Sequence, residues 1–169
     1  IKIYGNIIGL WDVSSVTDMS MLFENKSKFN DNISNWDVSN VTNMKGMFYY
    51  AISFNQYIGN WNVSNVKKMY SMFKNAKSFN QPINDWNISN VTDMDSMFLN
   101  ARSFNQPINT KEITKEDGST YIAWNVSNVT TMEAMFFKAY LFDQPINNWN
   151  VSNVTNMDSM FCGAELFNQ

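Results

Sequence analysis

The sequence contains no histidine and only one cysteine, Cys162, among its 169 residues. Without histidine the chain lacks the commonest general base and metal ligand, and no Ser–His or Cys–His nucleophile pair can form. A single cysteine excludes an internal disulfide and a cysteine-based metal cluster. These absences predict a protein that is not an enzyme, with no catalytic residue, no metal site and no cofactor.

Charge is also scarce. Charged residues make up 16% of the chain and the net charge is −3. No basic patch is available to hold a phosphate backbone, so we expect no nucleic-acid partner. No apolar run approaches the roughly 20 residues that a membrane helix needs, so we expect no membrane span in this segment.

The chain is instead rich in asparagine and in large apolar residues placed at a fixed period. Six tryptophans are separated by 25, 25, 25, 38 and 25 residues, and they are Trp11, Trp36, Trp61, Trp86, Trp124 and Trp149. Methionine and two phenylalanines keep the same step, for example Met44, Phe48 and Phe54. The longer step reflects an insertion at about residues 110–123, whose Asp117-Gly118 pair predicts a surface loop or short hairpin.

One repeat predicts a strand followed by a helix. Ile33, Trp36 and Val38 have the spacing of a strand in a leucine-rich repeat. Met44, Met47, Phe48 and Ala51 then fall at i, i+3, i+4 and i+7, which predicts a short helix capped by Thr42. The sequence therefore predicts an α/β repeat solenoid that resembles a leucine-rich repeat. It would have about six coils, each with one short parallel strand and one short helix per 25 residues.

We expect residues 1–169 to form one such domain. The repeat shows no polar cap at either end, which predicts a section of a longer chain that associates end to end when isolated. Residues at one repeat position would stack into columns, with the tryptophan, methionine and phenylalanine columns forming a continuous core.

The segments Asn35–Phe48, NWDVSNVTNMKGMF, and Ser78–Phe98, SFNQPINDWNISNVTDMDSMF, carry a family resemblance. The chain resembles the BspA-like surface-protein repeats, also called DUF285 or mycoplasma-lipoprotein-type repeats, and departs from their pattern at Leu22 and Tyr57. The resemblance implies a leucine-rich-repeat-like solenoid on a cell-surface or secreted protein. It also implies a role in adhesion, with a protein or glycan partner on another cell or in the matrix.

Two sets of residues are candidate binding surfaces. The first is the tyrosine patch, which comprises Tyr49, Tyr50 and Tyr70 on neighbouring coils, because tyrosine is enriched in recognition surfaces. The second is the Asx column, an outward-facing row that pairs with a serine column and could bind glycan hydroxyls or a peptide. Its members are Asp12, Asp37, Asn62, Asn87, Asn125 and Asn150. A solvated row of self-bonded side chains is the alternative for the Asx column, and scattered exposed aromatics for the patch.

Three functions follow in order of preference. The first is a surface-exposed, non-catalytic module for adhesion or for protein or glycan recognition. The second is a structural spacer or assembly element whose partners are neighbouring subunits. The third, an enzyme acting on polysaccharide, would need a defined carboxylate pair in a cleft, and the adjacent Asp12 and Asp37 do not supply one.

Overall fold

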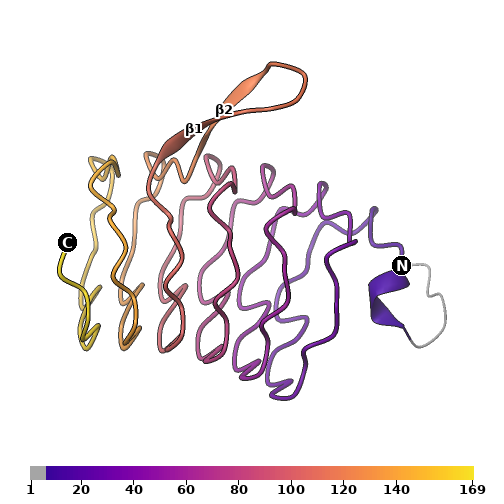
Figure 1. Ribbon diagram of the computed structural model, residues 1–169, viewed down its shortest axis with the longest axis horizontal. Helices are drawn as coiled ribbons and strands as arrows, with labels where there is room; N and C mark the ends of the chain where they lie inside the picture. Colours follow the sequence, from indigo (N-terminus) through magenta and orange to yellow (C-terminus); the bar gives the residue numbers. More distant parts are fainter. Residues whose placement is uncertain (1–6) are drawn as a thin grey trace.

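The computed structural model describes residues 7–169, whose repeats lie side by side in one stack of coils (Figure 1). Three regular elements occur in that range: the 3-10 turn η1 at Ile8–Leu10, strand β1 at Lys111–Thr114 and strand β2 at Thr120–Ala123. The remaining described residues form turns, bends and isolated bridges. The predicted α/β leucine-rich-repeat-like solenoid is therefore wrong, since the described coils contain neither the expected helix nor the expected strand.

A run of turns replaces the predicted helix. From Met44 to Tyr50, every second backbone N–H donates to a carbonyl of the next coil at 2.9–3.0 Å. Of the N–H groups between them, those of Met47 and Tyr49 close turns onto the carbonyl three residues earlier at 3.2 and 3.0 Å, and that of Lys45 donates to Asn43 Oδ1 at 3.1 Å. Gly46 and Tyr50 have φ values of 54° and 57°, which a right-handed helix cannot contain. Because an identical coil offers an acceptor to alternate N–H groups, hydrogen bonds between coils replace those of a helix.

Thr42 does not cap a helix either. Its hydroxyl donates to the Thr17 carbonyl of the preceding coil at 3.2 Å, beside a backbone bond of 2.8 Å between the same two residues.

Turns closed by backbone and side-chain hydrogen bonds replace the predicted strand. The N–H of Trp36 closes a turn onto Ile33 at 3.1 Å, and Asp37 accepts the N–H of Ser39 at 3.0 Å. These turns use N–H groups that a parallel ladder would need. Parallel pairing is reduced to one isolated bridge per coil, which joins Asp18, Asn43, Lys68, Asp93, Thr131 and Asn156 in sequence.

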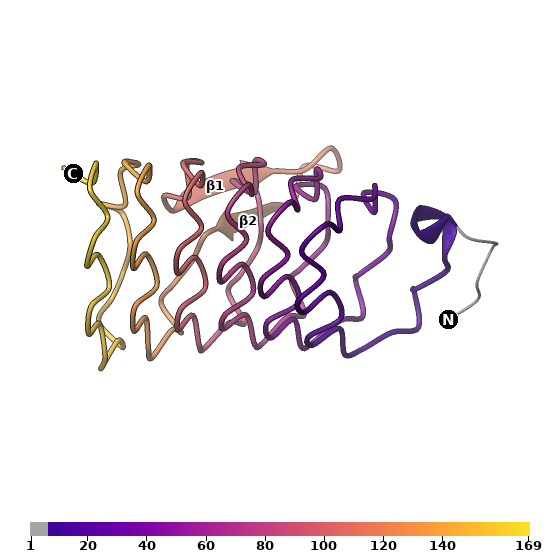
Figure 2. The same cartoon turned by 90° about the horizontal axis from the view of Figure 1, so that it is seen from below.

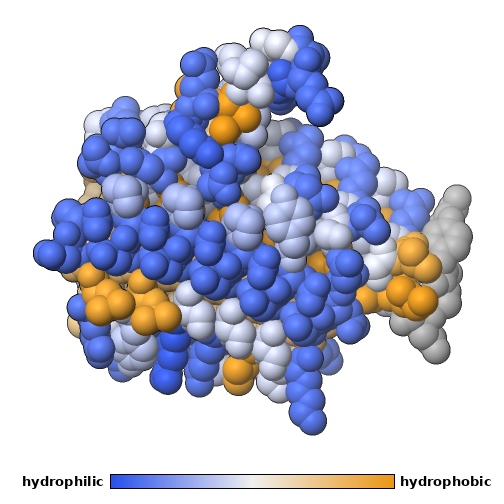
Figure 3. All heavy atoms as spheres, in the orientation of Figure 1, coloured by the Kyte–Doolittle hydropathy of each residue, from blue (hydrophilic) through white to orange (hydrophobic). Residues whose placement is uncertain are grey.

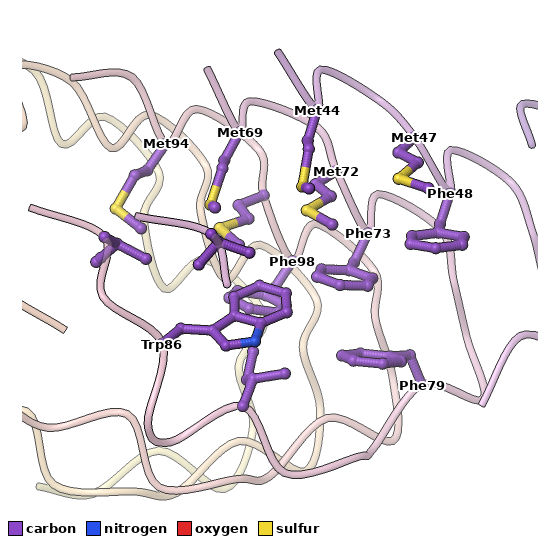
Figure 4. Packing of buried hydrophobic residues seen from close by; sticks show 14 of the residues in the cluster. Met44, Met47, Phe48, Met69, Met72, Phe73, Phe79, Trp86, Met94 and Phe98 are labelled. Atoms are coloured by element: carbon purple, nitrogen blue, oxygen red, sulfur yellow. The ribbon is translucent and has the colours of Figure 1, made fainter. Parts of the chain in front are cut away.

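The core nevertheless consists of the residues that the repeat predicted. Phe48, Phe73 and Phe98 are fully buried, with ring centroids 5.6 Å apart along their column. A second column packs against the first, as Phe79 stacks on Phe73 with centroids 4.0 Å apart. Figure 4 shows these parallel rings beside the methionines and Trp86. Stacking in register therefore buries each coil against its neighbours.

Polar groups inside the stack are bonded from coil to coil. Each tryptophan from Trp36 onward donates its indole N–H to the carbonyl of an isoleucine in the preceding coil, as Trp86 does to Ile58 at 3.2 Å. In the asparagine ladder each side-chain oxygen accepts the backbone N–H of the next member at 2.8–3.1 Å. The members of the ladder are Asn30, Asn55, Asn80, Asn105, Asp143 and Asn168. The ladder connects successive coils along one edge of the stack.

The insertion forms an antiparallel hairpin that projects from the stack. Strands β1 and β2 pair from Lys111 opposite Ala123 to Thr114 opposite Thr120, and Gly118 in the turn has a φ of 80°. Figure 2 shows both strands lying along the stack, over coils nearer the N-terminus. The coils on either side of the insertion remain in register, because Asp93 still bridges to Thr131.

Candidate binding surface

The tyrosine patch spans two neighbouring coils. The rings of Tyr49 and Tyr50 meet edge to face with centroids 4.8 Å apart, and 40% of Tyr50 is exposed. Tyr70 lies on the next coil, where its carbonyl accepts the N–H of Gly46. Two of the three rings are thus in direct contact, and the third belongs to the adjoining coil.

Lysines from the adjacent coils accompany these rings. Lys45 Nζ lies 4.8 Å from the centroid of Tyr70, and Lys74 Nζ lies 5.7 Å from that of Tyr49. A cation over an aromatic face holds the ring in place while leaving its edge available. The patch therefore combines aromatic area with positive charge. The face of the molecule drawn in Figure 3 is mainly hydrophilic, with a few hydrophobic side chains.

The Asx column caps its own backbone. The Oδ1 atom of each member accepts the N–H of the serine two residues later, at 3.0–3.2 Å. At Asp37 the bonds from Ser39 hold the pKa of the carboxyl below its ordinary value. The Oδ1 atom of each member accepts a turn N–H, so each side chain has only part of its polar capacity left for a ligand.

The asparagines that follow the Asx column bond to the backbone, as the sequence predicted for a turn position. Asn65 donates its amide to the Ser39 carbonyl at 2.7 Å, and Asn90 does so to Ser64 at 2.7 Å. These contacts satisfy carbonyls on the outer face.

The hairpin covers part of the Asx column and creates a cleft. We use the name hairpin cleft for a cavity of about 400 Å³ lined by Gly59, Asn60, Trp61, Asn62, Val63, Ser64, Asp85, Asn87, Ile113, Lys115 and Tyr121. Asn62 and Asn87 are thereby distinguished from the other members of their column. The cleft breaks the uniformity that the repeat imposes on this face.

The hairpin is attached to the stack at Asp85. Tyr121 donates its hydroxyl to the Asp85 carbonyl at 2.6 Å, and Lys111 pairs with the carboxylate at 2.7 Å. Burial, and then the charge of Asp85, raise the pKa of Tyr121 above its usual value, which keeps the phenol protonated as the donor. Sequence reasoning missed these three residues. The signal was Asp85 itself, since the residue before tryptophan is asparagine at Asn35, Asn60 and Asn148.

Within residues 7–169 no three His, Cys, Asp or Glu side chains are placed to hold a metal ion together. Cys162 is exposed. The same described residues include no helix of the length and apolarity needed to cross a membrane.

Stacked columns, interrupted by one hairpin, define the chain as a tandem-repeat protein. A family model described as "Mycoplasma protein of unknown function, DUF285" matches residues 2–111 and 109–169. The chain belongs to this family, as the repeated tryptophan and Met-Phe segments indicated. Comparison with curated proteins and with solved structures gave no match. The family description assigns no activity, so function must be argued from the surfaces described above.

Proposed function

We propose that this chain is a non-catalytic recognition module, displayed at a cell surface or secreted, that binds a partner protein or glycan in adhesion. The observation that carries the proposal is the tyrosine patch. Tyr49 and Tyr50 are in contact and partly exposed, with Lys45 and Lys74 beside the patch. Aromatic area with adjacent positive charge suits a partner that offers both apolar and acidic groups.

A structural spacer is the second candidate, and the Asx column favours it. Each member uses an oxygen to cap its own turn, and side-chain amides of the following asparagines bond to the preceding coil. A face organised in this way stabilises a rod of stacked coils without contacting any ligand. In this case the partners would be neighbouring subunits.

Exchanging the patch residues for those of another coil separates the two functions. Residues Ser20, Glu24 and Asn25 occupy the repeat positions of Tyr70, Tyr49 and Tyr50. The variant Tyr49→Glu, Tyr50→Asn, Tyr70→Ser should therefore fold while lacking the aromatic area. Tyr140→Ser, which copies Ser27 on a distant coil, is the matched control.

The measurement is binding of the purified chain to arrays of glycans and extracellular-matrix proteins. A recognition module gives saturable binding that the triple variant loses and the control keeps. Absence of saturable binding by the folded wild-type chain favours the spacer. Equal binding by the triple variant and the wild type would remove the tyrosine patch from the proposal.

A further inference from the structure

In the hairpin cleft the repeat provides a floor and a different element provides a roof. The floor comes from two coils, with Asn62 and Ser64 on one and Asn87 on the next. The roof comes from Ile113 on β1, Tyr121 on β2 and Lys115 in the turn between them. A cavity of about 400 Å³ lies within the range of small-ligand sites, roughly 300–1,000 Å³.

The floor offers mixed donors and acceptors in fixed positions. Asn62 Oδ1 accepts both the N–H and the hydroxyl of Ser64, at 3.2 and 2.7 Å. Asn87 does the same for Ser89, at 3.2 and 2.7 Å. These bonds orient each amide so that its NH₂ group remains as a donor, and the serine oxygen remains as an acceptor. Hydroxyl groups, which both donate and accept, complement such a surface.

The floor does not suit an added peptide strand. The N–H of Ser64 is committed to Asn62, and the Ser64 carbonyl accepts the amide of Asn90 at 2.7 Å. Strand addition requires a row of open backbone groups, and side chains already occupy them here. A ligand must therefore bond to the side chains of the floor.

The roof supplies apolar contact, and its lysines contact groups of the hairpin and the stack. Lys111 is paired with Asp85, and Lys115 Nζ lies 5.6 Å from the centroid of the Tyr121 ring. Ile113 and the half-buried Tyr121 present carbon atoms to the cleft. Because Tyr121 is bonded to the Asp85 carbonyl, the roof is held in place before any ligand arrives.

We propose that the hairpin cleft binds a neutral saccharide of one or two rings. Its hydroxyls bond to the amides and hydroxyls of Asn62, Ser64 and Asn87, and one sugar face packs against Tyr121 and Ile113. The inference deepens the proposed function by naming a glycan as a ligand, at a site separate from the tyrosine patch. The two can therefore fail independently.

The test is NMR titration of the full chain with lactose, cellobiose and N,N′-diacetylchitobiose. Binding should shift the side-chain amide signals of Asn62 and Asn87. The floor variant Asn62→Ala, Asn87→Ala is matched by Asn125→Ala, Asn150→Ala, which removes the corresponding acceptors of the serine N–H groups outside the cleft. Loss of a hydrogen bond at each position should weaken binding about tenfold or more in the floor variant, and less than about twofold in its control.

A second pair of variants leaves the floor intact. Tyr121→Ala removes the ring from the roof, whereas Ile122→Ala changes the neighbouring residue, which is 39% exposed. We expect Tyr121→Ala to abolish saturable binding and Ile122→Ala to preserve it. If no disaccharide shifts the two amide signals at millimolar concentration, or if binding survives both cleft variants, the cleft is not a saccharide site. Matrix-protein binding through the tyrosine patch would remain unaffected by that result.

Discussion

Asn80 gives the sharpest test of how the coils are joined. Its Oδ1 atom accepts the backbone N–H of Asn105 at 2.9 Å and the side-chain amide of Gln106 at 2.9 Å. The variant Asn80→Ala removes this acceptor in the middle of the asparagine ladder. The variant Asn80→Asp keeps it, because Asp143 serves Asn168 and Gln169 in the same way.

The magnitude follows from the groups that lose a partner. Asn105 is half-buried, and a backbone N–H left without an acceptor costs about 1–3 kcal/mol. Gln106 also donates to the Asn80 carbonyl at 3.1 Å, so its amide keeps one bond and adds little. We therefore expect Asn80→Ala to lower the free energy of unfolding by about 2 kcal/mol, and Asn80→Asp by less than half as much.

Urea unfolding at neutral pH measures both changes, and hydrogen exchange locates them. The amide of Asn105 should exchange faster in Asn80→Ala, while that of Asn55, which Asn80 does not accept from, should change less. Equal destabilisation by the two variants would refute the reasoning, because only one of them removes the acceptor. A cost of Asn80→Ala below about 0.5 kcal/mol would show that water replaces Asn80 as the acceptor of the Asn105 N–H.

Three further variants test the core, the backbone and the charges, each by urea unfolding. Phe79→Ala should cost about 3–5 kcal/mol because the ring is fully buried between its column neighbours, and a cost below 2 kcal/mol would contradict the stacked core. Lys138→Asn should stabilise the chain by about 0.5–1 kcal/mol, because Lys138 has a φ of 55° where other coils carry Asn75 and Asn100; no gain would argue against strain there. Burial and the nearby charge of Asp95 raise the pKa of Asp93, so folding disfavours its ionised form and its contribution to stability falls as pH rises above 3.8. Asp93→Asn should therefore stabilise the chain at pH 7 and have little effect at pH 3, and an equal effect at both would contradict the assignment.

The sequence predicted which residues are buried but not the backbone that buries them. Met44, Met47, Phe48 and Ala51 are all fully buried, as the spacing i, i+3, i+4, i+7 required. That spacing indicates one apolar face and is not unique to a helix. Turns that alternate between hydrogen bonds within a coil and between coils place the same residues on the same face.

Two signals in the repeat opposed the helix and the strand. The residues two and six positions after the first methionine have positive φ values, and they include Gly46, Asn75 and Asn100. Glycine and asparagine tolerate this conformation, whereas helices disfavour them. The segments Asp37-Val38-Ser39 and Asn62-Val63-Ser64 are likewise suited to side-chain turns, because the side-chain oxygen of aspartate or asparagine accepts the N–H of the residue two positions later.

The candidate sites could be predicted only in part. The sequence predicted that Tyr49, Tyr50 and Tyr70 form one patch on neighbouring coils, on a helix that is absent from the described residues, and the structure shows the rings of Tyr49 and Tyr50 in contact. The sequence could not place the hairpin over Asn62 and Asn87, because that arrangement depends on the contact of Tyr121 with Asp85, 36 residues earlier in the chain. An insertion carries no period, so its docking site cannot be derived from the spacing of the coils.

The stack of coils also explains where specificity can arise. A column with one residue type repeats the same contacts in every coil, so a ligand bound at one coil would bind equally well at the next. Asp85 ends that equivalence, because it holds the hairpin over two coils, and Asn62 and Asn87 are the members of the Asx column that line the cleft beneath it. The tyrosine patch also makes the coils inequivalent, because its side chains differ from those at the same positions of other coils while the core columns remain the same. Recognition by such a chain should therefore follow its irregular positions, and exchanging residues between coils is the means of testing each one without disturbing the core.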